Sequence, residues 1–113
     1  MKSILTLDIA HPPLRGAEAE AMLDQTFRSA RLSSSIKIIK VIHGYGSSGK
    51  GGTLKTLVRN WGFTNRHRIK VAIEGENLSP FNPQVQTLVV ECNLNSAQDL
   101  GIPNEGFTIF RIQ

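Results

Sequence analysis

A histidine and a cluster of glycines follow the most apolar stretch of the sequence. Residues 36–42 read IKIIKVI, His43 comes next, and glycines at positions 44, 46, 49, 51 and 52 follow with Lys50 among them. A neutral histidine beside a phosphate is able to act as a general base or as a proton donor. Glycine-rich turns free backbone N–H groups, and these groups bind phosphate oxygens together with a lysine ammonium. These residue types indicate a site for a phosphate-containing ligand.

Two nucleotide-binding patterns fit this loop only in part. Read from Gly44, the letters match G-x-x-x-x-G-K, but a nucleoside triphosphate loop continues with Ser or Thr to hold magnesium, and here Gly51 follows Lys50. The dinucleotide pattern G-x-G-x-x-G also fits. Its ribose-binding acid is absent, because residues 25–73 contain no Asp or Glu. The loop therefore favours a different anion, and a phosphodiester backbone is the first candidate.

Basic residues are concentrated in the same part of the chain. The 113 residues carry a formal net charge of +4, and ten of the thirteen Lys and Arg residues lie in the acid-free segment 25–73. The positive electrostatic field of such a segment attracts polyanions and raises the rate at which they encounter the protein. The expected contacts to nucleic acid are the loop backbone and cationic side chains at Gly44, Gly46, Lys50, Lys55 and Arg59. Tyr45 is able to stack on an unpaired base or to pack on the helix that follows.

Hydrophobic periodicity predicts the elements that must position these groups. Alternation with a period of two predicts strands, and a stripe at i, i+3 and i+4 predicts helices. In chain order we expect a strand at 4–9, a helix at 17–32, a strand at 36–42, a helix at 53–61 ended by Gly62, and strands at 69–74, 85–92 and 106–112.

This order predicts a two-layer α/β sandwich with a βαβα start followed by strands, in which two helices cover one mixed sheet. If the first two strands are parallel, their carboxyl ends share one edge, and Asp8 and His43 converge there. Asp8 is able to hold a metal ion or orient His43 in that position, or simply to end the strand in a turn. His43 is equally able to hydrogen-bond the loop and hold its shape. Two ligands fall short of a metal site, so no metal is predicted.

Length and composition predict a single domain spanning residues 1–113. The apolar fraction is 40% and the charged fraction 19%, as in soluble globular proteins. No apolar run approaches the ~20 residues needed to span a bilayer, so no membrane partner is expected. The first residues do not fit a signal peptide. Cys92 is the only cysteine, which excludes an internal disulfide, and we expect a cytoplasmic protein.

The segment VIHGYGSSGKGGTLKTLVRNW, residues 41–61, resembles the centre of the Smr (small MutS-related) domain. That family carries HGxG at the end of a strand, then a glycine-rich loop and a helix of the form xLKxxVxxW. The segment Leu7-Asp8-Ile9 resembles the start of the family's LDLH or LDLR element, whose fourth position is here Ala10, with His11 one place later. Residues 104–109 are similar to the closing N-P-G-x-T strand, and residues 75–103 are longer than is usual in the family.

The resemblance implies an Smr-like domain that binds DNA or RNA, and several members of the family nick or cleave it. By this resemblance Asp8 and His43 are the candidate catalytic residues of an endonuclease that hydrolyses phosphodiesters. The alternative is a non-catalytic module whose glycine loop holds a small anion or a protein partner. The sequence indicates no particular cofactor and leaves DNA versus RNA and the oligomeric state open.

Overall fold

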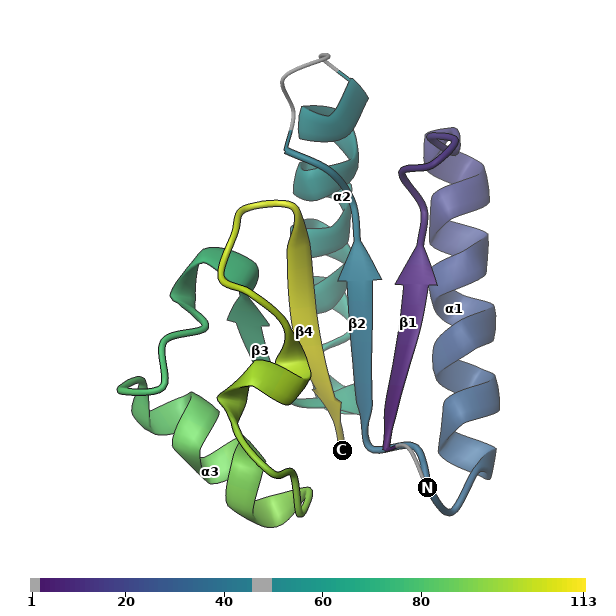
Figure 1. The fold of residues 1–113 in the computed structure, drawn as a ribbon. Helices are drawn as coiled ribbons and strands as arrows, with labels where there is room; N and C mark the ends of the chain where they lie inside the picture. Colours follow the sequence, from purple (N-terminus) through teal and green to yellow (C-terminus); the bar gives the residue numbers. More distant parts are fainter. Residues whose placement is uncertain (1–2, 46–49) are drawn as a thin grey trace.

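A computed structural model of the chain describes residues 3–45 and 50–113. A mixed four-stranded sheet of order β1-β2-β4-β3 forms its centre (Figure 1). The strands are β1 (Ile4–Asp8), β2 (Ile38–Ile42), β3 (Ile69–Glu74) and β4 (Phe107–Ile112). β1 and β2 are parallel, and β4 runs antiparallel to both β2 and β3. The predicted α/β class and the mixed sheet are confirmed.

Two helices, α1 (Gly16–Leu32) and α2 (Lys50–Thr64), cover one face of the sheet. Their apolar stripes meet the sheet in one core that contains Ala19, Leu23, Phe27, Ala30, Leu54, Val58, Trp61, Leu7, Val41 and Phe110. The rings of Phe27 and Trp61 lie 4.6 Å apart between centroids at the centre of this core. Burying a side chain of that size stabilises a protein by roughly 1.5–3 kcal/mol. The amphipathic patterns read from the sequence therefore place α1 and α2 correctly.

The opposite face of the sheet is covered by a helix that the hydrophobic pattern does not predict. The run VQTLVVEC is predicted as a strand at 85–92, but α3 (Pro83–Glu91) is helical. Its start has two helix signals, because Asn82 accepts a hydrogen bond from the N–H of Gln84 and Pro83 takes the first helical position. The described chain thus has three α-helices rather than two. With both faces covered, β2 places Ile39 and Val41 in one core and Ile38 and Ile42 at the other, which accounts for its isoleucine-rich sequence.

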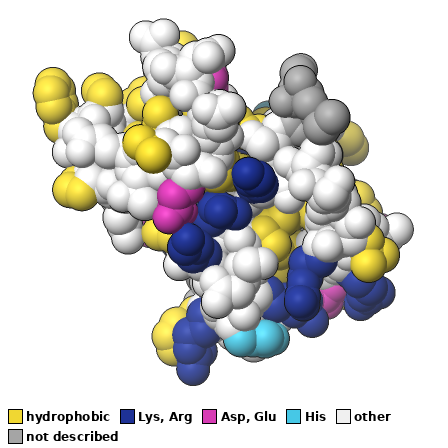
Figure 2. All heavy atoms as spheres, turned by 90° about the horizontal axis from the view of Figure 1, so that it is seen from below, with side chains coloured by type: hydrophobic (Ala, Val, Ile, Leu, Met, Phe, Trp, Pro, Cys, Tyr) yellow, Lys and Arg dark blue, Asp and Glu magenta, His cyan; other side chains and the backbone are white. Residues whose placement is uncertain are grey.

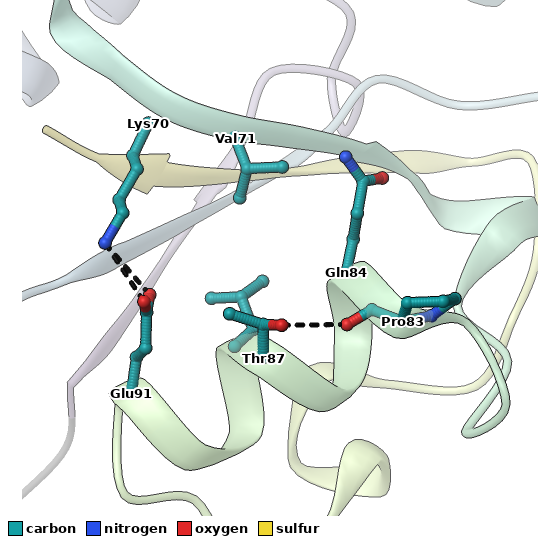
Figure 3. A pocket seen from close by; sticks show the side chains of 7 residues that line it. Lys70, Val71, Pro83, Gln84, Thr87 and Glu91 are labelled. Atoms are coloured by element: carbon teal, nitrogen blue, oxygen red, sulfur yellow. Dashed lines mark hydrogen bonds and ion pairs between the residues drawn. The ribbon is translucent and has the colours of Figure 1, made fainter.

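A small groove separates α3 from the edge strand β3 (Figure 3). It has a volume of about 250 Å³, and Val71, Pro83 and Gln84 are among the residues that line it. At one end the Lys70 ammonium donates a hydrogen bond to the Glu91 carboxylate at 3.1 Å, which joins β3 to α3. Three short 3-10 helices complete the described part of the chain, namely η1 (Arg66–Arg68), η2 (Gly75–Asn77) and η3 (Ala97–Leu100).

Gly62 is predicted to end the second helix, but it lies inside α2. The helix begins at Lys50 rather than at Thr53, and it continues through Gly62 to Thr64. A Cβ atom at Gly62 would lie 2.9 Å from Cε1 of Phe110, inside normal contact distance. Gly62 therefore lets the helix approach the sheet closely, and it does not end the helix. No helix in residues 3–45 or 50–113 is long and apolar enough to cross a bilayer.

Candidate functional site

The carboxylate at the end of β1 holds an exposed histidine. Asp8 accepts hydrogen bonds from the N–H groups of Ala10 and His11, at 2.8 and 3.1 Å, and these bonds shape the turn that follows the strand. The His11 ring returns to the same carboxylate, with Nδ1 3.0 Å from Oδ2. A carboxylate only accepts, so Nδ1 carries the hydrogen and donates it. The His11 side chain is 70% exposed, so the ring is open to solvent.

The surroundings of Asp8 favour its ionised form. Partial burial raises the pKa of Asp8, but hydrogen bonds from the Ala10 N–H and the His11 ring outweigh this effect and lower the pKa below its ordinary value. An ionised carboxylate on Nδ1–H fixes one tautomer of the imidazole. The other ring nitrogen, Nε2, is then in the form that accepts a proton from water.

His43, in contrast, is fully buried at the end of β2. Its Nδ1 lies 3.0 Å from the Gly44 carbonyl oxygen, and its Nε2 lies 2.9 Å from Oγ1 of Thr108. Because a carbonyl only accepts, Nδ1 donates to Gly44, and the neutral ring accepts from the Thr108 hydroxyl through Nε2. Both ring nitrogens are therefore used inside the protein.

The backbone around His43 ties the start of the glycine loop to β4. The N–H groups of His43 and Gly44 both donate to the Gly106 carbonyl at 3.0 Å. Gly44 has a φ of +84°, a left-handed conformation that glycine adopts without strain. The histidine and the first glycine of the HGxG segment thus have a structural role that the residues themselves explain.

Asp8 and His43 come to one edge of the sheet, but they project to different faces. Asp8 pairs in register with Ile42, which packs against the core under α3. His43 is the next residue along β2, and it contacts Thr108, whose strand partner Val41 lies in the core under α1 and α2. Because successive strand residues point to opposite faces, the two side chains have separate partners.

We expect His43 to make stability depend on pH in the mildly acidic range. Burial lowers the pKa of His43, and the charges of Arg59 and Lys55 lower it further against the opposing Gly44 hydrogen bond. Below pH ~6.5 the unfolded chain then binds a proton that the folded protein does not, so the free energy of unfolding falls as pH drops. Urea unfolding from about pH 5 to about pH 8 measures this slope.

The variant His43→Gln cannot titrate and is expected to flatten that slope. His67→Gln is the matched control, because the His67 side chain is exposed, and it should keep the wild-type slope. Equal slopes for the wild type and His43→Gln would contradict the role of the buried ring.

Two of the expected phosphate contacts are already paired with carboxylates. The Lys55 ammonium lies 3.1 Å from Glu105 and 3.9 Å from Glu76. The Arg59 guanidinium lies 2.9 Å from Glu74 and 3.2 Å from Glu76. The acid-free segment of the sequence is thus followed by acids that fold back onto α2. Two cations face three carboxylates here, so Lys55 and Arg59 do not form a free cationic surface.

Of the remaining candidate residues at the loop, the structure describes some and not others. Tyr45 is 62% exposed, and its ring lies beside Gly106, so one aromatic surface stays open to solvent. Gly46 and the side chain of Lys50 lie outside the described residues. Within the described part of the chain, no three His, Cys, Asp or Glu side chains come together in a way that suits a metal ion.

The Smr domain family model matches residues 12–77, more than half of the chain. The chain belongs to the Smr domain family. Among solved structures, the Smr domain of Thermus thermophilus MutS2 is similar, with a TM-score of 0.57 and 18% identity over 99% of both chains. At this identity the likeness shows that the Smr fold is shared. No curated protein matches the chain.

Proposed function

We propose that this Smr domain binds nucleic acid and hydrolyses phosphodiester bonds at the edge of the sheet where β1 ends. The observation that carries the proposal is the exposed His11 ring held by Asp8 at 3.0 Å, because a fixed imidazole open to solvent is suited to general base catalysis. Membership of the Smr family supports nucleic acid as the substrate class. The exposed Tyr45 ring supports contact with unpaired bases near the same edge.

In the proposed reaction, Nε2 of His11 accepts a proton from water while the water oxygen attacks phosphorus. The bond from phosphorus to the leaving sugar oxygen breaks, and that oxygen gains a proton from the imidazolium or from solvent. One water is consumed, and the products are a phosphomonoester and a free hydroxyl. Asp8 holds Nδ1–H and stabilises the imidazolium. His43 is a positioning residue in this scheme, because its contacts hold the start of the loop.

We further propose that residues 1–113 act as one domain in the cytoplasm. The buried free thiol of Cys92 supports a reducing compartment. Burial also raises the pKa of Cys92, which disfavours the reactive thiolate.

Binding and cleavage assays with the purified domain test this proposal. We expect the domain to bind DNA or RNA with a log–log salt slope of about −3 on single strands, as four phosphate contacts would give. We also expect it to nick supercoiled plasmid or to cut RNA. Both reactions are measured with and without added divalent metal. Absence of any affinity for both nucleic acids at low salt would refute the proposal. Binding without cleavage under every metal condition would refute the proposed hydrolysis and favour a non-catalytic module.

A further inference from the structure

Cationic side chains gather at the end of the molecule opposite the Asp8 edge. In Figure 1 the carboxyl ends of β1 and β2 lie at the top, and α1 ends at the bottom beside the chain termini. Figure 2 looks at that lower end and shows Lys and Arg side chains around a hollow, with few acidic ones. The cations come from four elements, with Arg28 and Arg31 in α1, Arg68 in η1, Lys70 in β3 and Arg111 in β4.

Two adjoining hollows connect these side chains. The first has a volume of about 380 Å³ and is lined by Arg28, Arg31 and Arg68. The second has a volume of about 440 Å³ and is lined by Arg31, Lys70 and Arg111. Because Arg31 lines both hollows, the five cations form one continuous feature, which we call the basic groove.

The basic groove keeps an excess of positive charge after its ion pairs are formed. Asp24 lies 3.4 Å from Arg68, and Glu91 lies 3.1 Å from Lys70 and 3.8 Å from Arg111. Among the described residues, no carboxylate forms an ion pair with Arg28 or Arg31, and both side chains are exposed. Five cations therefore face two carboxylates in the basic groove, whereas Lys55 and Arg59 face three carboxylates beside α2.

Helix dipoles do not account for this arrangement. Arg28 and Arg31 suit the negative C-terminal end of α1. Arg68, Lys70 and Arg111 come from other elements, and the chain gathers them at the same end. A fork of guanidinium N–H donors matches a phosphate group, so the groove has the chemistry of a phosphodiester contact.

We propose that the basic groove is the main contact of this domain with the phosphate backbone of nucleic acid, an inference that rests on the proposed function. An exposed aromatic favours nucleic acid over an acidic protein. Phe63 is 70% exposed, and its ring centroid lies 4.4 Å from the guanidinium carbon of Arg66, two residues before Arg68 in the chain. An exposed aromatic ring with a cation on it offers a surface for stacking of an unpaired base.

The size of the molecule allows one nucleic acid to reach both ends. The longest extent of the domain is 35 Å. One turn of a DNA duplex rises about 34 Å. A strand of one such turn that is held in the basic groove is therefore long enough to extend to the Asp8 edge. In this arrangement, the basic groove provides the affinity and the opposite end of the domain provides the cleavage.

Two double variants that remove the same net charge test this inference. Arg28→Gln with Arg31→Gln removes the two unpaired cations of the basic groove, and Lys55→Gln with Arg59→Gln removes the two paired cations of α2. The affinity of each variant is measured over a salt series for labelled single-stranded DNA and RNA, each with about as many nucleotides as one strand of a duplex turn. Thermal unfolding checks that each variant is folded. The single variants Arg31→Gln and Lys55→Gln repeat the comparison if either double variant unfolds.

We expect the groove double variant to bind at least about tenfold more weakly and to lose between about 1 and 2 units of salt slope. The α2 double variant should bind within about threefold of the wild type, because its cations are already neutralised. The reverse pattern would overturn the inference and leave the proposed function standing. A wild-type domain that binds neither DNA nor RNA would overturn the proposed function itself.

Competition identifies the occupant of the groove. Unlabelled DNA or RNA should displace the labelled strand at a lower charge concentration than polyglutamate or vesicles of phosphatidylserine and phosphatidylcholine. Equal displacement by polyglutamate or by the vesicles would refute nucleic acid as the occupant.

Discussion

Replacement of His11 by alanine is expected to reduce phosphodiester cleavage by about 10²- to 10⁴-fold, because the side chain that accepts the proton from water is removed. The ring is 70% exposed and its hydrogen bond is to Asp8, so the fold should not change. Affinity for nucleic acid should stay close to that of the wild type, since no cation of the basic groove is altered. Plasmid nicking and RNA cutting rates at saturating protein measure the effect.

Two further variants separate this role from its alternatives. Asp8→Asn keeps a side-chain oxygen for the turn but loses the charge that stabilises an imidazolium, so we expect a smaller loss of cleavage than in His11→Ala. His43→Gln should cleave at a substantial fraction of the wild-type rate, because His43 is buried and bonded on both ring nitrogens. Full activity in His11→Ala together with loss of activity in His43→Gln would show that His43, and not His11, is the catalytic residue.

Gly75→Ala is expected to lower the free energy of unfolding by at least about 3 kcal/mol. A Cβ at Gly75 would lie 2.3 Å from the carbonyl oxygen of Asn104 and 2.7 Å from that of Phe107. Both are backbone atoms, so no side chain can turn aside to make room. The Gly75 carbonyl also accepts the N–H of Asn104 at 3.1 Å, and the substitution would separate these segments. Chemical or thermal unfolding of the variant gives the value directly.

Gly16→Ala is the matched control for this prediction. A Cβ at Gly16 would lie 3.5 Å from Cδ1 of Leu57, an ordinary contact, and the position is in the first turn of α1. Because alanine favours helix more than glycine does, we expect unchanged stability or a gain of up to about 1 kcal/mol. Wild-type stability in Gly75→Ala would mean that η2 does not pack against the start of β4 as described.

Local patterns were sufficient for most of the elements. The alternation of residues 4–9 and the isoleucine-rich run before His43 predict β1 and β2, and their parallel pairing follows from the helix between them. The prediction of a strand at 85–92 is wrong, because Val85, Leu88 and Val89 fall at the i, i+3 and i+4 spacing of a helix face. Asn82 and Pro83 together are the signal that distinguishes the two, since they favour the start of a helix.

The charge pattern along the chain predicted the site less well, because folding brings distant residues together. Glu74 and Glu76 follow the acid-free segment and then turn back onto Lys55 and Arg59. The basic groove is assembled from residues as far apart as Arg28 and Arg111, so no single stretch of sequence reveals it. The contact between His11 and Asp8 had a visible signal, since a histidine three residues after a strand-ending aspartate is close enough to return to its carboxylate.

The amide N–H NMR spectrum of the domain, followed while DNA or RNA is added, tests most directly that nucleic acid is bound in the basic groove and extends to the Asp8 edge. We predict that the amides of Arg28, Arg31, Arg68 and Lys70 shift together with those of Ala10 and His11. Unchanged spectra with both nucleic acids, or shifts confined to α3 and the residues that follow it, would contradict this prediction.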